Sequence, residues 1–217
     1  MAKSNKFLIP ERPIDSEAYE RLYEFNSGAD DMYEAHDDVR EIRFRPGLTE
    51  EAVYRMLPSA KGFEYGGYLT KSRIRFHKCE PVRAVYQRSK PCTFHSHPTK
   101  YAQADIPSAS DVYHFLDGRN LRTIIVGASR LIVWDKTMAT LETVKKLGTW
   151  AKIHLVTETR RLLNESPNNF MEEYMKVALK HLGLNWPKKH RIWETHWEGM
   201  VRDILKIEVR VFSRSPE

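Results

Sequence analysis

Residues 62–134 form a series of short segments rich in β-branched and aromatic residues, and this pattern limits the possible fold more than any other feature. Five segments predict strands: FEYGGYLT, SRIRFHKCEPV, PCTFHSHP, RTIIVGA and SRLIVWD. One helix, from near Ser108 to about Leu116, interrupts them, and the last two segments form a hairpin turning at Gly127–Ser129. Strands, a helix and then further strands predict an α/β fold with a mixed β-sheet flanked by helices.

The flanking sequence extends this unit in both directions. EIRFRPG, which begins at Glu41, predicts a further strand, and Thr49 is a good N-cap for a helix that ends near Pro58. Before them, an acidic extension over 1–40 contains one predicted helix. The α/β domain occupies 41–140. A C-terminal helical extension over 141–217 contains three helices and ends in a strand, IEVRVF.

The composition excludes several classes of protein. The chain has 217 residues, and no apolar run reaches the roughly 18 residues of a membrane-spanning helix. Its N-terminus lacks the apolar stretch of a secretion signal. Two cysteines, Cys79 and Cys92, are too few for a disulfide framework or a four-thiolate zinc site. We expect reduced thiols, a cytoplasmic location and no membrane partner.

Charge is distributed unevenly along the chain. Residues 11–40 contain ten acidic side chains, whereas residues 71–100 contain eight basic side chains and one acidic side chain, Glu80. A basic segment could face an acidic protein or a nucleic acid. Because no aromatic and basic pattern of a nucleic-acid-binding module accompanies it, we favour a solvated face over a nucleic-acid interface.

The chemistry is concentrated in FHSHPTKYAQADIPSASD. His95 and His97 are two residues apart in a predicted strand, so their side chains point to the same face, where both could bind one metal ion. Asp111 could add a carboxylate oxygen from the following helix. Such a set at about 2.0–2.2 Å leaves a fourth tetrahedral position for water, as in catalytic zinc sites. Alone, the two histidines are weak evidence for a metal, because such pairs on a strand often only form hydrogen bonds at the surface.

Two further residues carry alternative interpretations. Ser108 with Asp111 resembles a helix capping box, which would also direct Asp111 toward the metal. Glu64, early in the first strand of the mixed unit, could accept a proton or could be an ordinary surface glutamate. The neighbouring pair Gly66 and Gly67 indicates a close backbone approach or a bulge.

Taken together, Glu64 in EYGGYL, His95-Ser96-His97-Pro98 and the PSASD segment ending at Asp111 resemble the JAMM motif of the JAB/MPN metallopeptidase family. The order of predicted elements also matches the family, over about residues 40–136. One difference is the loop at 98–107, which is longer than the family's usual spacing. Loops tolerate such insertions at small cost, so we expect an effect on substrate fit more than on metal binding.

The resemblance implies a zinc-dependent hydrolase of peptide or isopeptide bonds. His95, His97 and Asp111 would bind Zn²⁺, and Glu64 would act as general base. Ser108 would help to stabilise the oxyanion. The implied substrate is a protein, such as a ubiquitin-like modifier or its conjugate. Three alternatives stay open: an MPN-like protein-binding scaffold, a DNA-associated JAB-domain protein, and an amidase of small molecules.

Overall fold

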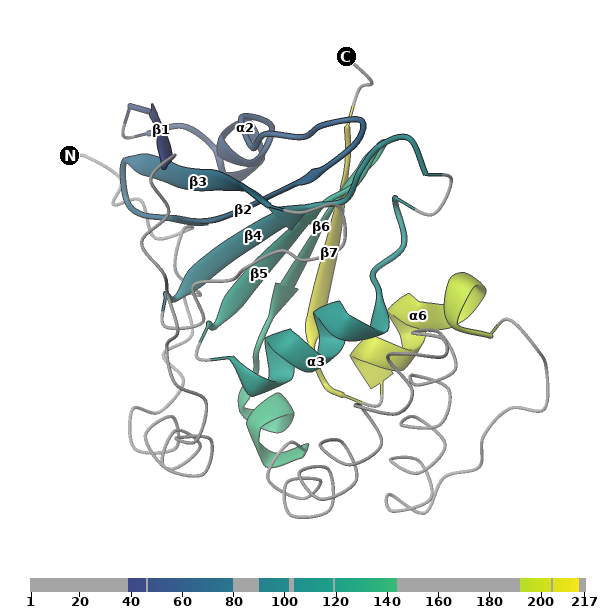
Figure 1. The fold of residues 1–217 in the computed structure, drawn as a ribbon. Helices are drawn as coiled ribbons and strands as arrows, with labels where there is room; N and C mark the ends of the chain where they lie inside the picture. The colour runs from purple at the N-terminus through teal and green to yellow at the C-terminus, as the bar shows by residue number, and fades with distance from the viewer. Residues whose placement is uncertain are drawn as a thin grey trace.

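The computed structural model describes residues 39–45, 47–79, 90–101, 104–118, 120–143, 192–203 and 205–214. Its strands form one mixed seven-stranded sheet in the order β1-β3-β2-β4-β5-β6-β7 (Figure 1). The strands are β1 (Arg40–Arg43), β2 (Glu64–Leu69), β3 (Arg73–Cys79), β4 (Cys92–Ser96), β5 (Arg122–Val126), β6 (Arg130–Asp135) and β7 (Glu208–Ser213). The helices are α2 (Glu50–Tyr54), α3 (Ala109–Asp117) and α6 (Ile192–Asp203), with a further helical segment at 138–143.

The connection between β4 and β5 determines where the candidate site lies. These two strands are parallel, whereas the other paired strands are antiparallel. Parallel neighbours need a crossover, and α3 supplies it. The helix therefore starts after the carboxyl end of β4 and returns along one face of the sheet (Figure 1). This topology brings the N-terminus of α3 close to the histidine strand.

The two faces of the sheet are covered by different elements. Helix α2 packs on one face over the main apolar cluster, where Tyr54 and Phe94 are fully buried. Helices α3 and α6 lie on the other face (Figure 1). There the Trp134 ring lies 5.8 Å from the Phe115 ring and 6.2 Å from the Trp197 ring, measured between centroids. This second face is the one that carries the candidate site.

The glycine pair of β2 allows the strand to pack closely. A Cβ atom added to Gly67 would lie 2.1 Å from the Arg75 carbonyl oxygen and 2.8 Å from a ring carbon of Phe94. The register between β2 and β3 continues through Gly66 and Gly67 without an extra residue. Of the two predicted alternatives, the structure therefore confirms close approach rather than a bulge.

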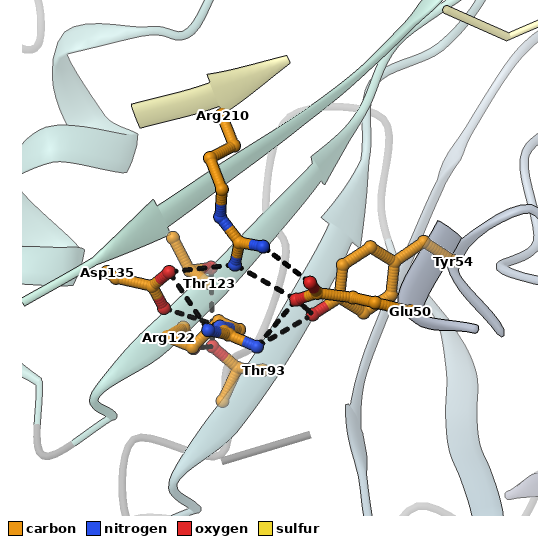
Figure 2. A network of polar contacts seen from close by, with 7 residues as sticks. All are labelled: Glu50, Tyr54, Thr93, Arg122, Thr123, Asp135 and Arg210. Carbon is orange, nitrogen blue, oxygen red and sulfur yellow. Dashed lines mark hydrogen bonds and ion pairs between the residues drawn. The ribbon is translucent and has the colours of Figure 1, made fainter. Parts of the chain in front are cut away.

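A group of charged side chains joins the C-terminal strand to α2 (Figure 2). Glu50 accepts hydrogen bonds from Arg122 Nη1 at 2.7 Å and from Arg210 Nη2 at 2.9 Å. Asp135 accepts from the same two arginines, at 3.0 Å from Arg122 Nη2 and 2.9 Å from Arg210 Nη2. Tyr54 donates its hydroxyl to Glu50 at 2.6 Å. We call these five residues the ionic cluster; it connects elements that are up to 160 residues apart.

The predicted elements are confirmed wherever the structure describes them. All five strand segments of 62–134, the strand near Glu41 and the terminal strand are present, and Thr49 caps α2 by accepting a hydrogen bond from the Ala52 amide. The predicted helix in 1–40 and most of the predicted helical extension lie outside the described residues. Within the described part of that extension, β7 pairs with β6 in the same sheet. The division at residue 140 stays a prediction.

The described helices are too short or too polar to cross a membrane.

Candidate metal centre

His95 and His97 lie at the carboxyl end of β4. His95 is within the strand, and His97 follows its last residue but still donates its amide to the Val126 carbonyl at 2.9 Å. Extended backbone therefore continues through both histidines, which places both imidazoles on the face covered by α3. Their Nε2 atoms are 3.1 Å apart. The predicted convergence of the two side chains is confirmed.

Asp111 reaches the histidines from the first turn of α3. Ser108 is the N-cap, and its hydroxyl oxygen accepts a hydrogen bond from the Asp111 amide at 3.2 Å. In return, the Ser108 amide donates to Asp111 Oδ2 at 2.6 Å, which completes the predicted capping box. The same contact that starts the helix thus fixes the rotation of the Asp111 carboxylate.

The three side chains meet at one buried point. Asp111 Oδ1 is 3.0 Å from His95 Nε2, and Oδ2 is 3.1 Å from His97 Nε2. Exposed fractions are 2% for His95, 9% for His97 and 7% for Asp111. Nitrogen and oxygen donors around a tetrahedral zinc ion are about 3.3 Å apart, so the observed spacing needs only a slight expansion to admit one. In the part of the chain that the structure describes, these three side chains form the group that could hold a metal ion.

The pKa values of the three groups move in different directions. Burial lowers the pKa of His95, despite the attraction of Asp111. Burial also acts to lower the pKa of His97, but Asp111 and Glu64 outweigh it and the pKa is raised. Burial would raise the pKa of Asp111, yet the two imidazoles hold it well below its usual range. Asp111 is therefore ionised at neutral pH, and its fixed negative charge favours a cation at this point.

Glu64 lies on the same face of the sheet as His95. It is the first residue of β2, and Gly66, two residues further on, pairs directly with His95. Because side chains two apart on a strand share a face, Glu64 points to the side of the sheet that holds the histidines. It is partly buried, and its charge acts on the pKa of His97. The structure therefore brings Glu64 into the electrostatic environment of the histidine group.

Ser96 connects the strand of the glutamate to the strand of the histidines. Its side chain is fully buried, and its hydroxyl oxygen accepts a hydrogen bond from the Tyr65 amide at 2.8 Å. Tyr65 is the neighbour of Glu64, so this contact extends the pairing of β2 with β4 up to the glutamate. In the sequence, Ser96 stands out only as the middle residue of the His95-Ser96-His97 motif. A serine between two histidines that share one face of a strand, with another strand beside it, is the pattern that could have indicated this hydrogen bond.

Other residues singled out in the sequence play structural parts. Within the described residues, Cys79 and Cys92 are buried thiols outside any disulfide, and burial raises the pKa of Cys92 to about 12, which makes it a poor nucleophile. In the described part of the basic segment, Arg73 and Arg75 both lie near the Glu41 carboxylate, at 3.4 and 3.8 Å. Their positive charge is therefore partly neutralised within the sheet.

Comparison of the chain with models of protein families, with curated proteins and with solved structures found no match. The function of the site must therefore be inferred from its own geometry and chemistry.

Proposed function

We propose that this protein is a zinc-dependent hydrolase of peptide or isopeptide bonds, of the JAMM type. The observation that supports this most is the buried convergence of His95, His97 and Asp111, with Glu64 on the same face of the sheet. Two neutral nitrogen donors and one carboxylate are the ligands that catalytic zinc sites use, and they leave a coordination position for a reactant.

Zinc at this point would act as a Lewis acid and lower the pKa of a bound water to about 7. The protein supplies the proton transfers. Glu64 would accept a proton from the attacking water at its carboxylate oxygen and pass it to the amine nitrogen as the carbon–nitrogen bond breaks. Ser108 would donate its hydroxyl to the substrate's carbonyl oxygen as negative charge develops there. Asp111, held by the Ser108 amide, and the histidines would keep the metal in place.

The proposed substrate is a protein whose extended tail is joined to another amine, such as a ubiquitin-like modifier or its conjugate. A tail of this kind would reach a site at the end of a strand by adding itself to the sheet, because main-chain hydrogen bonds bind extended peptides without demanding one sequence.

The decisive variant is Glu64→Gln, assayed on ubiquitin-like proteins fused through a peptide or isopeptide bond, with and without a chelator. Because Glu64 is a base and not a ligand, we expect zinc affinity to be unchanged and turnover to fall about 10²–10⁴-fold. Glu51→Gln is the matched control, since Glu51 is partly exposed on α2 and pairs with Arg55. Wild-type turnover by Glu64→Gln would exclude Glu64 from the mechanism. Zinc binding without hydrolysis by the wild type would favour a scaffold.

A further inference from the structure

The long loop between His97 and Ser108 contributes a hydrogen-bond acceptor to the metal centre. The carbonyl oxygen of Ala104 lies 3.0 Å from His97 Nδ1. A carbonyl oxygen can only accept a hydrogen bond, so Nδ1 of His97 carries the proton in this contact. The other ring nitrogen, Nε2, faces His95 and Asp111 and keeps its lone pair for binding a metal. Contacts of this kind fix both the ring orientation and the tautomer of a metal-binding histidine.

The residue after Ala104 anchors this part of the loop. Asp105 Oδ1 accepts hydrogen bonds from the Ser129 amide at 2.8 Å and the Arg130 amide at 3.2 Å. Asp105 Oδ2 accepts from the Ser129 hydroxyl at 2.6 Å. One carboxylate thus binds three donors at the turn between β5 and β6. The turn joins two paired strands of the sheet, so it gives the loop a support outside its own segment.

Gly127 makes room for this attachment. A Cβ atom built on Gly127 would lie 2.3 Å from Asp105 Oδ1 and 2.8 Å from the Ala104 carbonyl oxygen. Any side chain at position 127 would therefore push away both the anchor and the acceptor of His97. The loop and the turn meet at a backbone distance that only glycine permits.

We propose that Asp105 is a positioning residue for the metal centre: by binding the β5–β6 turn it holds the Ala104 carbonyl against His97. This inference rests on the metal-binding part of the proposed function but does not require peptidase activity. It also gives the long loop a role in positioning a metal ligand, in addition to the expected effect on substrate fit. Loss of the anchor leaves the three ligands in the chain but lets the His97 ring rotate.

The test is zinc affinity of the purified full chain, measured by competition with a chromophoric chelator, alongside hydrogen exchange of the metal-free protein. In Asp105→Ala we expect faster exchange of the Ser129 and Arg130 amides and zinc binding about tenfold weaker. Asp105→Asn, which keeps a carbonyl oxygen in place, should recover most of the affinity. Gly127→Ala should weaken zinc binding as Asp105→Ala does, because it displaces the same segment from the other side.

A control separates positioning from general loss of stability. Thr49→Ala removes the N-cap of α2 on the opposite face of the sheet, so it should lower the unfolding midpoint and leave zinc affinity unchanged. Wild-type zinc affinity in Asp105→Ala would overturn the inference, and so would an equal loss of affinity in Thr49→Ala. A wild-type chain that binds no zinc would instead overturn the metal centre itself, and the role of Asp105 with it.

Discussion

Single residues at the candidate metal centre serve two purposes at once. Ser108 and Asp111 form a helix cap, and the same hydrogen bonds aim the Asp111 carboxylate at the histidines. Ser96 completes a strand pairing and thereby supports the residue next to Glu64. The hydrogen bonds that position the site are therefore also hydrogen bonds that stabilise the fold. Substitutions at these positions should therefore lower the stability of the fold, and unfolding and zinc binding can be measured separately.

Ser96→Ala tests the support given to the glutamate strand. The change leaves the part-buried Tyr65 amide without its side-chain acceptor, so we expect the free energy of unfolding to fall by about 1 kcal/mol. Urea unfolding followed by circular dichroism measures this. Zinc affinity should change little, because Ser96 is not one of the three candidate metal ligands and its hydroxyl bonds to the Tyr65 amide. A loss below about 0.5 kcal/mol would mean that the contact contributes nothing.

At the scale of elements, the ionic cluster joins β7 to α2. Arg122 is buried and forms ion pairs with both Glu50 and Asp135. Arg210 is less buried and pairs with the same two carboxylates. Charges at this depth are stable only as a paired set. The cluster therefore couples β7, which comes from the C-terminal part of the chain, to α2 and the centre of the sheet (Figure 2).

Arg122→Ala should be strongly destabilising. It leaves the partly buried Glu50 carboxylate and the buried Asp135 carboxylate with Arg210 as their remaining cationic partner in the cluster, so we expect a loss of about 3–5 kcal/mol. The comparison is Arg55→Ala, which removes an exposed pair with Glu51 and should cost less than about 1 kcal/mol. Both values come from denaturant unfolding at one pH. Equal effects of the two substitutions would contradict a coupling role for the cluster.

The same cluster predicts how stability depends on pH. Burial acts to raise the pKa of Glu50, but hydrogen bonds from Arg210 and Tyr54 and the charge of Arg122 outweigh it, so the pKa lies below its ordinary value of 4.5. The unfolded chain then takes up the proton first as pH falls. The contribution of Glu50 is thus complete above about pH 4.5 and is lost as pH falls through the lower, folded pKa.

Glu50→Gln provides the measurement for this pH effect. The variant should be less stable than the wild type at pH 7, and the difference in unfolding free energy should shrink as the pH is lowered below about 4.5. A difference that is constant from pH 7 to the acid range would show that the charge of Glu50 does not contribute.

At the scale of the whole molecule, local patterns of the sequence predicted what local physics determines. Alternation of apolar residues located the strands, a capping signal located the start of α3, and spacing by two placed His95 and His97 on one face. Contacts between distant segments were not predictable in this way. Nothing near Ala104 indicates that its carbonyl meets His97, and Arg122 resembles a surface arginine until β6, β7 and α2 surround it.

The central claim is that one metal ion binds between β4 and α3. Anomalous diffraction at the zinc absorption edge, from crystals of the zinc-loaded protein, tests it most directly. The account predicts one strong peak within about 2.0–2.2 Å of His95 Nε2, His97 Nε2 and a carboxylate oxygen of Asp111. A zinc-loaded crystal with no peak between these three side chains, or with its zinc held elsewhere, would contradict the account.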